Sequence, residues 1–229
     1  MSEIDGWWRI GRMIVVPAAR VLFRLRFLGA ERIPADGPAI LAANHVSMLD
    51  GPTLCIAPYS RGRIVRSLVA SEFFDVPLVG WCLRRLRQIP IRRGRKDSGA
   101  LDEAIATVRA GAIAAIFPEG HVNPDPDHLQ RVRTGVARIA LASGAPVMPV
   151  GIWGSQWRWS KRDGIRFSLP LRLPLTFAFG DPIPAFGDPD DLDAVAAFAA
   201  RVEEGIRAAS ALARTDAESR ATPAVLERG

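Results

Sequence analysis

Short apolar runs alternate with longer segments of helical periodicity along most of the chain after Pro34. The apolar runs consist largely of Ile, Val, Leu and Ala and are too short for helices, which is typical of buried strands. We expect strands at residues 38–43, 64–69, 89–91, 112–117, 147–152 and 173–179. We expect helices at residues 51–57, 77–86, 98–110, 134–143 and 192–213. This alternation predicts an α/β fold, a single domain with a central mixed, partly parallel sheet flanked by helices.

The two ends of the chain depart from this pattern. Residues 7–28 mix apolar positions with arginines and predict an N-terminal basic amphipathic helix. Two interpretations stay open, because an apolar stripe with Trp7 and Trp8 suits both the membrane interface and packing on the helix's own domain. We therefore divide the chain into an N-terminal amphipathic helix at 1–30, for which the membrane interface stays one of two interpretations, a main domain at 31–213, and a flexible polar tail at 214–229.

Composition narrows the class of protein. The chain has 229 residues, is 48% hydrophobic and carries a formal net charge of +6. It can therefore bury one sizeable core, and it favours an anionic partner such as anionic lipid, a phosphorylated small molecule or nucleic acid. Its two cysteines, Cys55 and Cys82, form no CxxC motif, so we expect neither a disulfide framework nor a metal site, and a reducing compartment.

We expect no signal peptide and no transmembrane helix. The most apolar early stretch, residues 13–28, is interrupted by a proline and three arginines, which is too much charge for the centre of a bilayer.

His45 and Asp50 follow the first predicted buried strand, where ligands bind in open α/β sheets. Five residues apart, they would not face each other on one helix, so they can meet only if the chain turns between them, as Gly51-Pro52 favours. A neutral imidazole can take a proton from an attacking alcohol, and a carboxylate can fix its tautomer. The alternatives are a helix-capping Asp50 and a His45 that only ends a strand.

Further polar groups follow other predicted strands. Phe117-Pro118-Glu119-Gly120 comes directly after the second strongly buried strand. Glu119 would share a cleft with His45 if the two strands are near neighbours. The alternative is that the segment is an ordinary turn.

Seven cations lie between residues 84 and 96 without one acid. Such a run is usually a solvated face, but a short strand at 89–91 would fix Arg92 and Arg93, and a fixed guanidinium binds phosphate with two hydrogen bonds.

Taken together, these blocks resemble the 1-acylglycerol-3-phosphate acyltransferase family over about residues 15–185. The blocks are Asn44-His45-Val46-Ser47-Met48-Leu49-Asp50, Ile89-Pro90-Ile91-Arg92-Arg93, Phe117-Pro118-Glu119-Gly120 and Val147-Met148-Pro149-Val150, in that order. The resemblance implies that His45 is the general base and Asp50 its orienting partner. The candidate substrate-binding residues are Asn44, Arg92, Arg93, Glu119 and Gly120, and no metal is implied.

The chain departs from the family's pattern at several positions. The third block usually continues with threonine and arginine, where His121 and Val122 stand. The second block usually opens with glycine where Arg87 stands, and a lysine common upstream of Glu72 is Ala70 here.

The resemblance implies an acyltransferase of phospholipid biosynthesis. It would move a fatty-acyl group from acyl-CoA or acyl carrier protein, as a co-substrate without further cofactor, to the hydroxyl of a lysophospholipid, with 1-acyl-glycerol-3-phosphate as the expected acceptor. Its partners would be this acyl thioester, the acceptor and an anionic membrane surface, at the cytoplasmic face of the cell membrane, and no nucleic acid is expected. Alternatives are a glycerol phosphate, aminolipid or glycolipid acceptor, or a non-catalytic lipid-binding module.

A second membrane hypothesis concerns residues 153–162. Trp153, Trp157 and Trp159 alternate there with Arg158, Lys161 and Arg162. Tryptophans with cations suit the headgroup zone of a bilayer. A surface on which nucleic-acid bases stack has the same composition, and the rings could also pack on the core.

Overall fold

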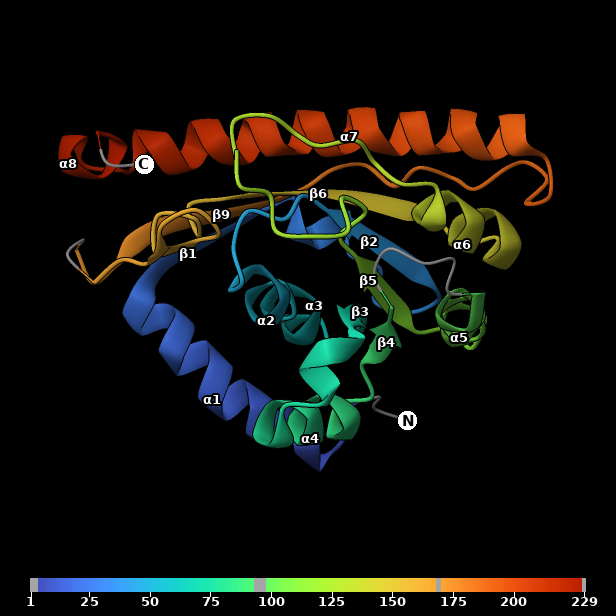
Figure 1. The fold of residues 1–229 in the computed structure, drawn as a ribbon, viewed down its shortest axis with the longest axis horizontal. Helices are drawn as coiled ribbons and strands as arrows, with labels where there is room; N and C mark the ends of the chain where they lie inside the picture. The colour runs from blue at the N-terminus through green and yellow to red at the C-terminus, as the bar shows by residue number, and fades with distance from the viewer. Residues whose placement is uncertain (1–3, 93–97, 168–169, 228–229) are drawn as a thin grey trace.

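A computed structural model describes residues 4–92, 98–167 and 170–227 of the chain (Figure 1). Seven strands form its main sheet in the order β1-β9-β6-β2-β5-β3-β4. They are β1 (Phe23–Leu28), β2 (Ala39–Ala43), β3 (Val65–Ala70), β4 (Ile89–Ile91), β5 (Ile113–Ile116), β6 (Val147–Trp153) and β9 (Leu173–Phe179). A separate two-stranded sheet pairs β7 (Trp159–Ser160) with β8 (Gly164–Ile165).

The sheet is mixed and mostly parallel, as predicted. The five neighbouring strands β6, β2, β5, β3 and β4 run parallel, β9 is antiparallel to β6, and β1 is parallel to β9. The five parallel strands therefore end at the same edge of the sheet, and the segments that follow β2, β5 and β6 are neighbours there.

The central strands are apolar throughout because both of their faces are covered. Every residue of β2, β5 and β6 is buried. Their side chains alternate between two cores: Leu41 and Ala43 contribute to one, and Ile40 and Ala42 to the other. This explains why the strands read as continuous apolar runs and not as alternating ones.

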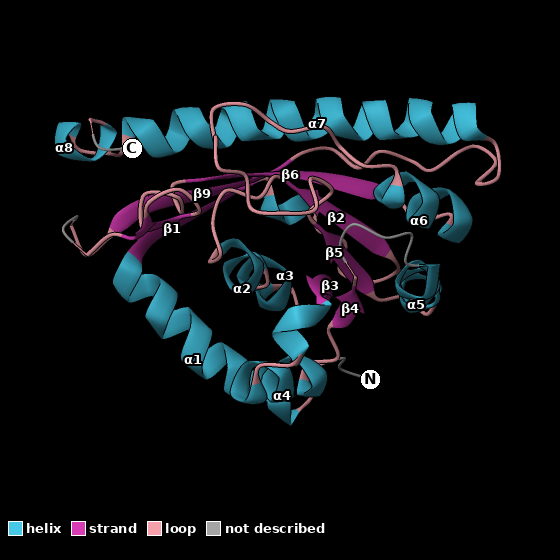
Figure 2. Cartoon of the chain, viewed as in Figure 1, coloured by secondary structure: helices cyan, strands magenta, loops and turns pink. Residues whose placement is uncertain are grey.

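Helices cover both faces, which confirms the predicted α/β layers (Figure 2). The first core is completed by the short helices α2 (Asp50–Leu54) and α3 (Ile56–Ser60). The second is completed by α5 (Ser98–Arg109), α6 (Gly135–Ser143) and the amino-terminal half of α7 (Leu192–Ser219), which runs along the sheet in Figure 1. The remaining elements are α1 (Gly6–Leu22), α4 (Pro77–Arg85), α8 (Pro223–Leu226) and the 3-10 turns η1 (Ala30–Arg32) and η2 (Ser71–Phe74).

The predicted helix at residues 7–28 is correct only as far as Leu22. Residues 23–28 instead form β1, an edge strand paired with β9. Their sequence alternates apolar Phe23, Leu25 and Phe27 with Arg24 and Arg26, which is a period of two. Because the arginines also continued the polar positions of the preceding helix, the change of period was overlooked.

The C-terminal segment is also more regular than predicted. We expected the last helix to end at Ala213 and a loose tail to follow, but α7 continues to Ser219 and α8 follows it. Ala217 and Val225 are buried in the first core, which explains why the chain stays helical beyond 213. The prediction failed because alanine-rich turns bury small side chains without a strong apolar pattern.

The second membrane hypothesis is wrong for three of its six residues. Trp153, Trp157 and Arg158 are buried, and the Arg158 guanidinium donates to the carbonyl oxygens of Arg166 and Leu171. Burial lowers the pKa of Arg158. These side chains therefore hold the segment after β6 onto the core.

Arg87, which stands where the family usually has glycine, lies in the left-handed backbone region. Its φ is 53°, and no other non-glycine residue of the described ranges has a positive φ, so glycine would suit this position without backbone strain.

No helix within the described residues is both long enough and apolar enough to cross a bilayer.

Candidate active site

His45 and Asp50 meet at the carboxyl end of β2. His45 Nδ1 lies 3.0 Å from Asp50 Oδ2, and the Asp50 side chain is fully buried while that of His45 is 13% exposed. The chain turns between them because the same carboxylate oxygen accepts the backbone N–H groups of Val46 and Ser47, each at 2.8 Å. Asp50 thus organises the turn, starts α2 and orients the imidazole with one side chain.

The other carboxylate oxygen is held from β6. Ser155, two residues beyond the end of this strand, donates its hydroxyl to Asp50 Oδ1 at 2.5 Å. Ser155 and Asp50 are both inaccessible to solvent. Asp50 therefore accepts hydrogen bonds on both oxygens, which satisfies the acceptors of a buried carboxylate.

This arrangement sets the protons of His45. An ionised carboxylate only accepts, so Nδ1 carries the proton that is shared with Asp50, and Nε2 keeps its lone pair. The ring also stacks on Phe117, with centroids 4.1 Å apart and planes at 21°. Within the described residues, no side chain hydrogen-bonds Nε2, so this nitrogen is available as a base for an incoming hydroxyl.

Glu119 fixes the main chain of His45 and is itself buried. Its Oε1 accepts the backbone N–H of His45 at 2.7 Å, while Oε2 accepts the Asn123 side-chain amide at 2.9 Å and the Gln130 N–H at 3.2 Å. The backbone N–H of Asn123 returns to the carbonyl of His45 at 2.7 Å. Burial raises the pKa of Glu119, and the hydrogen bonds from His45 and Gln130 oppose that shift. The segment after β5 therefore clamps the peptide on both sides of His45.

The remaining predicted site residues are placed as follows. Asn44 is buried and pairs with Ile152, donating to its carbonyl at 3.0 Å and accepting its N–H at 2.7 Å, so its amide extends the pairing of β2 with β6. Gly120 has a φ of 81°. Arg92 is exposed directly after β4, at the same edge of the sheet, and Arg93 lies outside the described residues. Substrate binding by these five residues, Glu119 included, stays a prediction.

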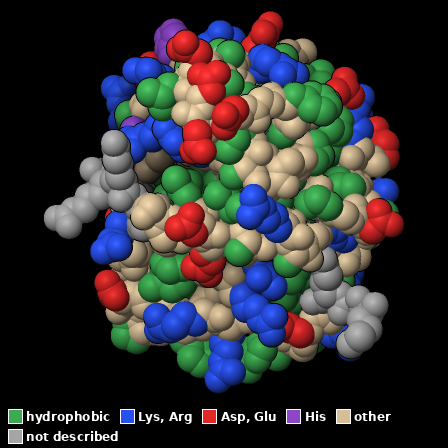
Figure 3. Space-filling model, turned by 90° about the vertical axis from the view of Figure 1, so that its right-hand side faces the viewer, with side chains coloured by type: hydrophobic (Ala, Val, Ile, Leu, Met, Phe, Trp, Pro, Cys, Tyr) green, Lys and Arg blue, Asp and Glu red, His purple; other side chains and the backbone are tan. Residues whose placement is uncertain are grey.

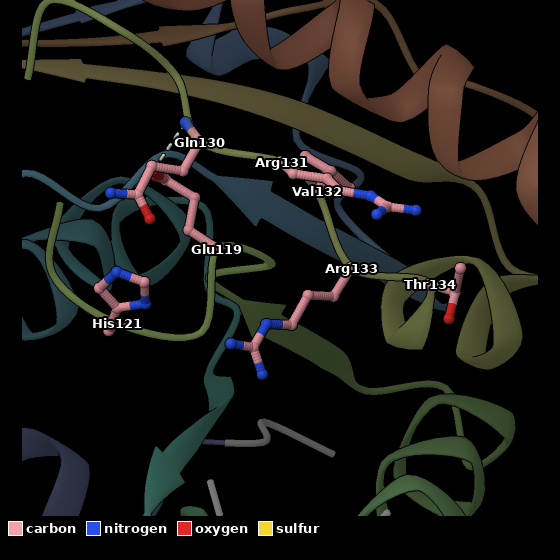
Figure 4. Close-up of a pocket in the computed structure, with 7 residues that line it drawn as sticks. All are labelled: Glu119, His121, Gln130, Arg131, Val132, Arg133 and Thr134. Carbon is pink, nitrogen blue, oxygen red and sulfur yellow. Dashed lines mark hydrogen bonds between the residues drawn. The ribbon is translucent and has the colours of Figure 1, made fainter. Parts of the chain in front are cut away.

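A pocket of about 460 Å³ opens beside Glu119 (Figure 4). It is lined by Glu119, His121 and residues 130–134, and its size suits a small ligand or headgroup. Val122 is buried, so the position where the family carries arginine presents no cation here. The guanidinium of Arg133 lies in the pocket instead, against Gly120.

Sequence reasoning missed Ser155, Asn123, Gln130 and Arg133. All four lie in segments that follow β5 or β6, so the rule that strand ends carry ligands pointed to the right segments. Nothing in the local pattern distinguished these polar residues from ordinary loop positions.

Cys55 does not extend the site. Burial raises the pKa of the Cys55 thiol to about 12, and the thiol donates to the carbonyl of Gly51 at 3.5 Å. A thiol with this pKa stays protonated at neutral pH and is a poor nucleophile.

Comparison with known proteins adds the family. A family model described as Acyltransferase matches residues 24–153, more than half of the chain. A lyso-ornithine lipid O-acyltransferase of Pseudomonas aeruginosa is 32% identical over 166 residues, which cover 72% of this chain and 56% of the relative. A chloroplastic 1-acyl-sn-glycerol-3-phosphate acyltransferase of Arabidopsis thaliana is 27% identical over 136 residues, which cover 58% of this chain and 37% of the relative.

A solved structure shares the fold. The 1-acyl-sn-glycerophosphate acyltransferase of Thermotoga maritima superposes with a TM-score of 0.64 at 22% sequence identity, over 90% of this chain and 83% of that one. The chain spans about half the length of the curated relatives that it matches.

Proposed function

This chain belongs to the acyltransferase family, and on that premise we propose that it transfers a fatty-acyl group from an acyl thioester to the hydroxyl of a lysophospholipid, with 1-acyl-glycerol-3-phosphate as the acceptor. The observation that carries the proposal is the pairing of His45 Nδ1 with the fully buried Asp50, because it leaves Nε2 available as a base. The relatives named for lysophosphatidate and lyso-ornithine lipid support an acceptor of the lysolipid class.

The reaction is a direct transfer. His45 Nε2 takes the proton of the acceptor hydroxyl as its oxygen attacks the thioester carbonyl carbon, so a C–O bond forms and the C–S bond breaks. The thiolate leaves with the electron pair of that bond, and the imidazolium returns its proton to the thiolate or to water. Asp50 stabilises the imidazolium while the proton resides there.

A covalent acyl-enzyme is not needed. Two candidate nucleophiles around this pair are otherwise engaged, since Ser155 donates to Asp50 and burial raises the pKa of the Cys55 thiol to about 12. The thiolate of the donor is a good leaving group because a thiol is a weaker base than an alcohol. We propose acyl-CoA or acyl carrier protein as the donor, and no cofactor beyond this co-substrate.

The experiment is thiol release by purified protein with an acyl thioester and 1-acyl-glycerol-3-phosphate. We expect His45→Ala to lower turnover roughly 10²–10⁴-fold, the usual contribution of a general base. His128 offers a matched control, because its Nδ1 lies the same 3.0 Å from Asp125 Oδ2, but on the surface, with the His128 side chain 81% exposed. Wild-type turnover in His45→Ala would exclude the mechanism, and loss in His128→Ala would show that the assay responds to any histidine–aspartate pair.

An aminolipid acceptor is the second candidate. It is favoured by the relative from Pseudomonas aeruginosa, which is named for lyso-ornithine lipid and is 32% identical to this chain, against 27% for the chloroplastic relative named for 1-acyl-sn-glycerol-3-phosphate. Acceptor profiling with a mixture of lysolipids separates the two candidates, together with the glycerol phosphate and glycolipid alternatives. If none of the acceptors in the mixture supports thiol release, the non-catalytic lipid-binding module remains as the interpretation.

We also propose that the protein works at the cytoplasmic face of the cell membrane, held by a surface that α1 and α4 form together. The two helices contact through Trp7 and Trp81, whose rings meet edge to face at 5.0 Å. The Arg85 guanidinium lies over both rings, at 5.2 Å and 5.6 Å from their centroids. Tryptophan and arginine together suit the headgroup region of a bilayer.

This surface, called the α1–α4 surface below, is apolar and basic. Its exposed large apolar side chains are Ile10, Met13, Ile14, Val21, Leu78, Val79 and Trp81. Asp5 caps α1, and from there on the charged residues within α1 and α4 are all arginines. In Figure 3, acidic side chains gather toward the upper end of the face shown, while basic and apolar ones dominate the lower end, where α1 and α4 lie in Figure 1. Anionic lipid matches both properties.

A further inference from the structure

Arg133 places its guanidinium in the pocket beside Glu119. Within the described residues, this group makes no hydrogen bond or ion pair, whereas the buried arginines Arg63 and Arg158 are bonded to backbone carbonyls. Figure 4 shows its side chain extended along the pocket, in a different direction from that of Arg131. A guanidinium has five N–H donors, so Arg133 retains its full capacity to bind an anion.

Gly120 makes room for this guanidinium. A Cβ at position 120 would lie 3.0 Å from both Cζ and Nε of Arg133 and 3.4 Å from Nη1. The guanidinium therefore lies against Gly120, one residue after Glu119. Any larger residue at 120 would push it away and would also have to adopt a φ of 81°.

The position of Arg133 is fixed relative to the catalytic base. Its backbone N–H donates to the carbonyl of Pro118 at 3.0 Å, and three residues earlier the N–H of Gln130 donates to Glu119 Oε2. The other oxygen of Glu119 holds the backbone of His45 at 2.7 Å. One carboxylate thus connects the segment that carries Arg133 with the segment that carries the base.

The pocket favours an anion. Its lining contains two arginines and one acid, and both oxygens of that acid, Glu119, are already engaged by protein donors. The carboxylate of Glu119 therefore does not neutralise Arg133 by a direct ion pair.

We propose that Arg133 binds the phosphate monoester of the acceptor lipid and so selects lysophosphatidate over acceptors without that phosphate. This inference rests on the proposed function. The acceptor then lies between two anchors, with its phosphate on Arg133 and its free hydroxyl at Nε2 of His45. The planar guanidinium fits a phosphate because two N–H groups can bond two of its oxygens.

The test compares two acceptors that differ only in the phosphate. Thiol release is measured in mixed micelles with 1-acyl-glycerol-3-phosphate and with 1-acyl-glycerol, and the ratio of the two kcat/KM values is the readout. We expect Arg133→Ala to lower this ratio about 10- to 100-fold, the range for losing hydrogen bonds to a charged group, through KM for the phosphorylated acceptor. Because both acceptors are measured on one preparation, partial unfolding cancels from the ratio.

Two variants control the result. Arg61→Ala removes another exposed arginine, which lies before β3 at the opposite end of the parallel strands, and should leave the ratio within about twofold of the wild-type value. Arg133→Lys keeps the positive charge but lacks the paired N–H donors of the planar guanidinium, so it should restore part of the ratio.

The outcomes separate the inference from the function beneath it. Suppose that the wild type releases thiol and that Arg133→Ala lowers kcat/KM equally for both acceptors. Arg133 would then have a structural role only, and the inference would be wrong. Lyso-ornithine lipid serves as a third acceptor. If Arg133→Ala lowers kcat/KM for this acceptor alone, Arg133 binds a carboxylate, and the proposal that it binds the phosphate is overturned. No thiol release by the wild type with any acceptor would instead contradict the proposed function, and the inference would fall with it.

Discussion

Asp50 depends on Ser155 for the hydrogen bond to its second carboxylate oxygen. Oδ2 accepts three donors, whereas Ser155 is the one donor to Oδ1 among the described residues. In Ser155→Ala a buried carboxylate oxygen would lack a donor, which is costly, so the carboxylate should rotate away from its alignment with His45. We expect kcat to fall roughly tenfold with KM unchanged, measured from initial rates of thiol release.

The conservative variant distinguishes positioning from mere stability. Ser155→Thr keeps a hydroxyl at this position and should recover most of kcat, even if its extra methyl group lowers the melting temperature. If Ser155→Ala unfolds at a lower temperature but its folded fraction turns over at the wild-type rate, the hydroxyl does not position Asp50.

At the scale of single residues, the sequence predicted contacts that are local and missed those that are not. His45 and Asp50 lie within six residues, and the Gly51-Pro52 turn favoured their meeting. Ser155 bonds Asp50 from 105 positions away, and no short-range pattern carries that information. Asn44 and Glu119 were predicted beside the base as substrate ligands, but a single sequence could not reveal that their polar atoms bond the backbone of Ile152 and His45.

At the scale of elements, helix α7 packs directly against strand β6, the strand that precedes Ser155. Gly151 lies in β6, four residues before Ser155, and a Cβ there would overlap the backbone of Ala209 and Ser210 in α7. Because backbone atoms cannot give way as a flexible side chain can, Gly151→Ala must separate the helix from the strand. We expect the free energy of unfolding to fall by about 1–3 kcal/mol, the usual cost of overpacking, measured by denaturant titration.

Gly135→Ala is the matched control for this prediction. Gly135 begins α6, and its added Cβ would meet only a side-chain carbon of Leu101, at an ordinary contact distance of 3.7 Å. Alanine is the better helix former, so this variant should be as stable as the wild type or more stable. Equal stability of the two variants would mean that α7 can move off β6 without cost.

Elements were predicted well where one period covered the whole segment. The central strands are apolar on both faces, and α6 ends at Gly144, whose φ of 72° suits the end of a helix. β1 was missed because a helix and a strand join at Leu22 and Phe23 without a turn residue between them. In such a junction only the change from a period of 3.6 to a period of 2 marks the boundary, and six residues are few to detect it.

On the scale of the whole molecule, the fold brings together residues from segments that are far apart in the sequence. The candidate active site combines the ends of β2, β5 and β6, and the α1–α4 surface combines helices about 70 positions apart in the chain. The sequence predicted the fold class and the basic character of the first helix. It could not predict that Trp81 would join Trp7 while Trp153 and Trp157 would be buried, because tryptophan suits both a core and a membrane interface.

The α1–α4 surface leads to a prediction about lipid binding. Each large apolar side chain that enters a bilayer contributes about 1.5–3 kcal/mol, and the arginines add attraction to anionic headgroups. Replacing Met13 and Leu78, which are 75% and 73% exposed, by aspartate should therefore abolish most of the association while leaving the fold intact. We expect the double variant to bind anionic vesicles at least about tenfold more weakly than the wild type in flotation at low salt, with little binding of either to zwitterionic vesicles.

Phe186→Asp is the control, because Phe186 is just as exposed, at 79%, but lies in the loop before α7. Turnover separates docking from catalysis, since the Met13 and Leu78 substitutions touch neither His45 nor Asp50. With an acceptor embedded in vesicles the double variant should lose most of its rate, whereas with a short-chain acceptor dispersed in water it should match the wild type. Full flotation of the double variant, or equal loss with both acceptors, would show that the protein reaches its lipid by some other surface.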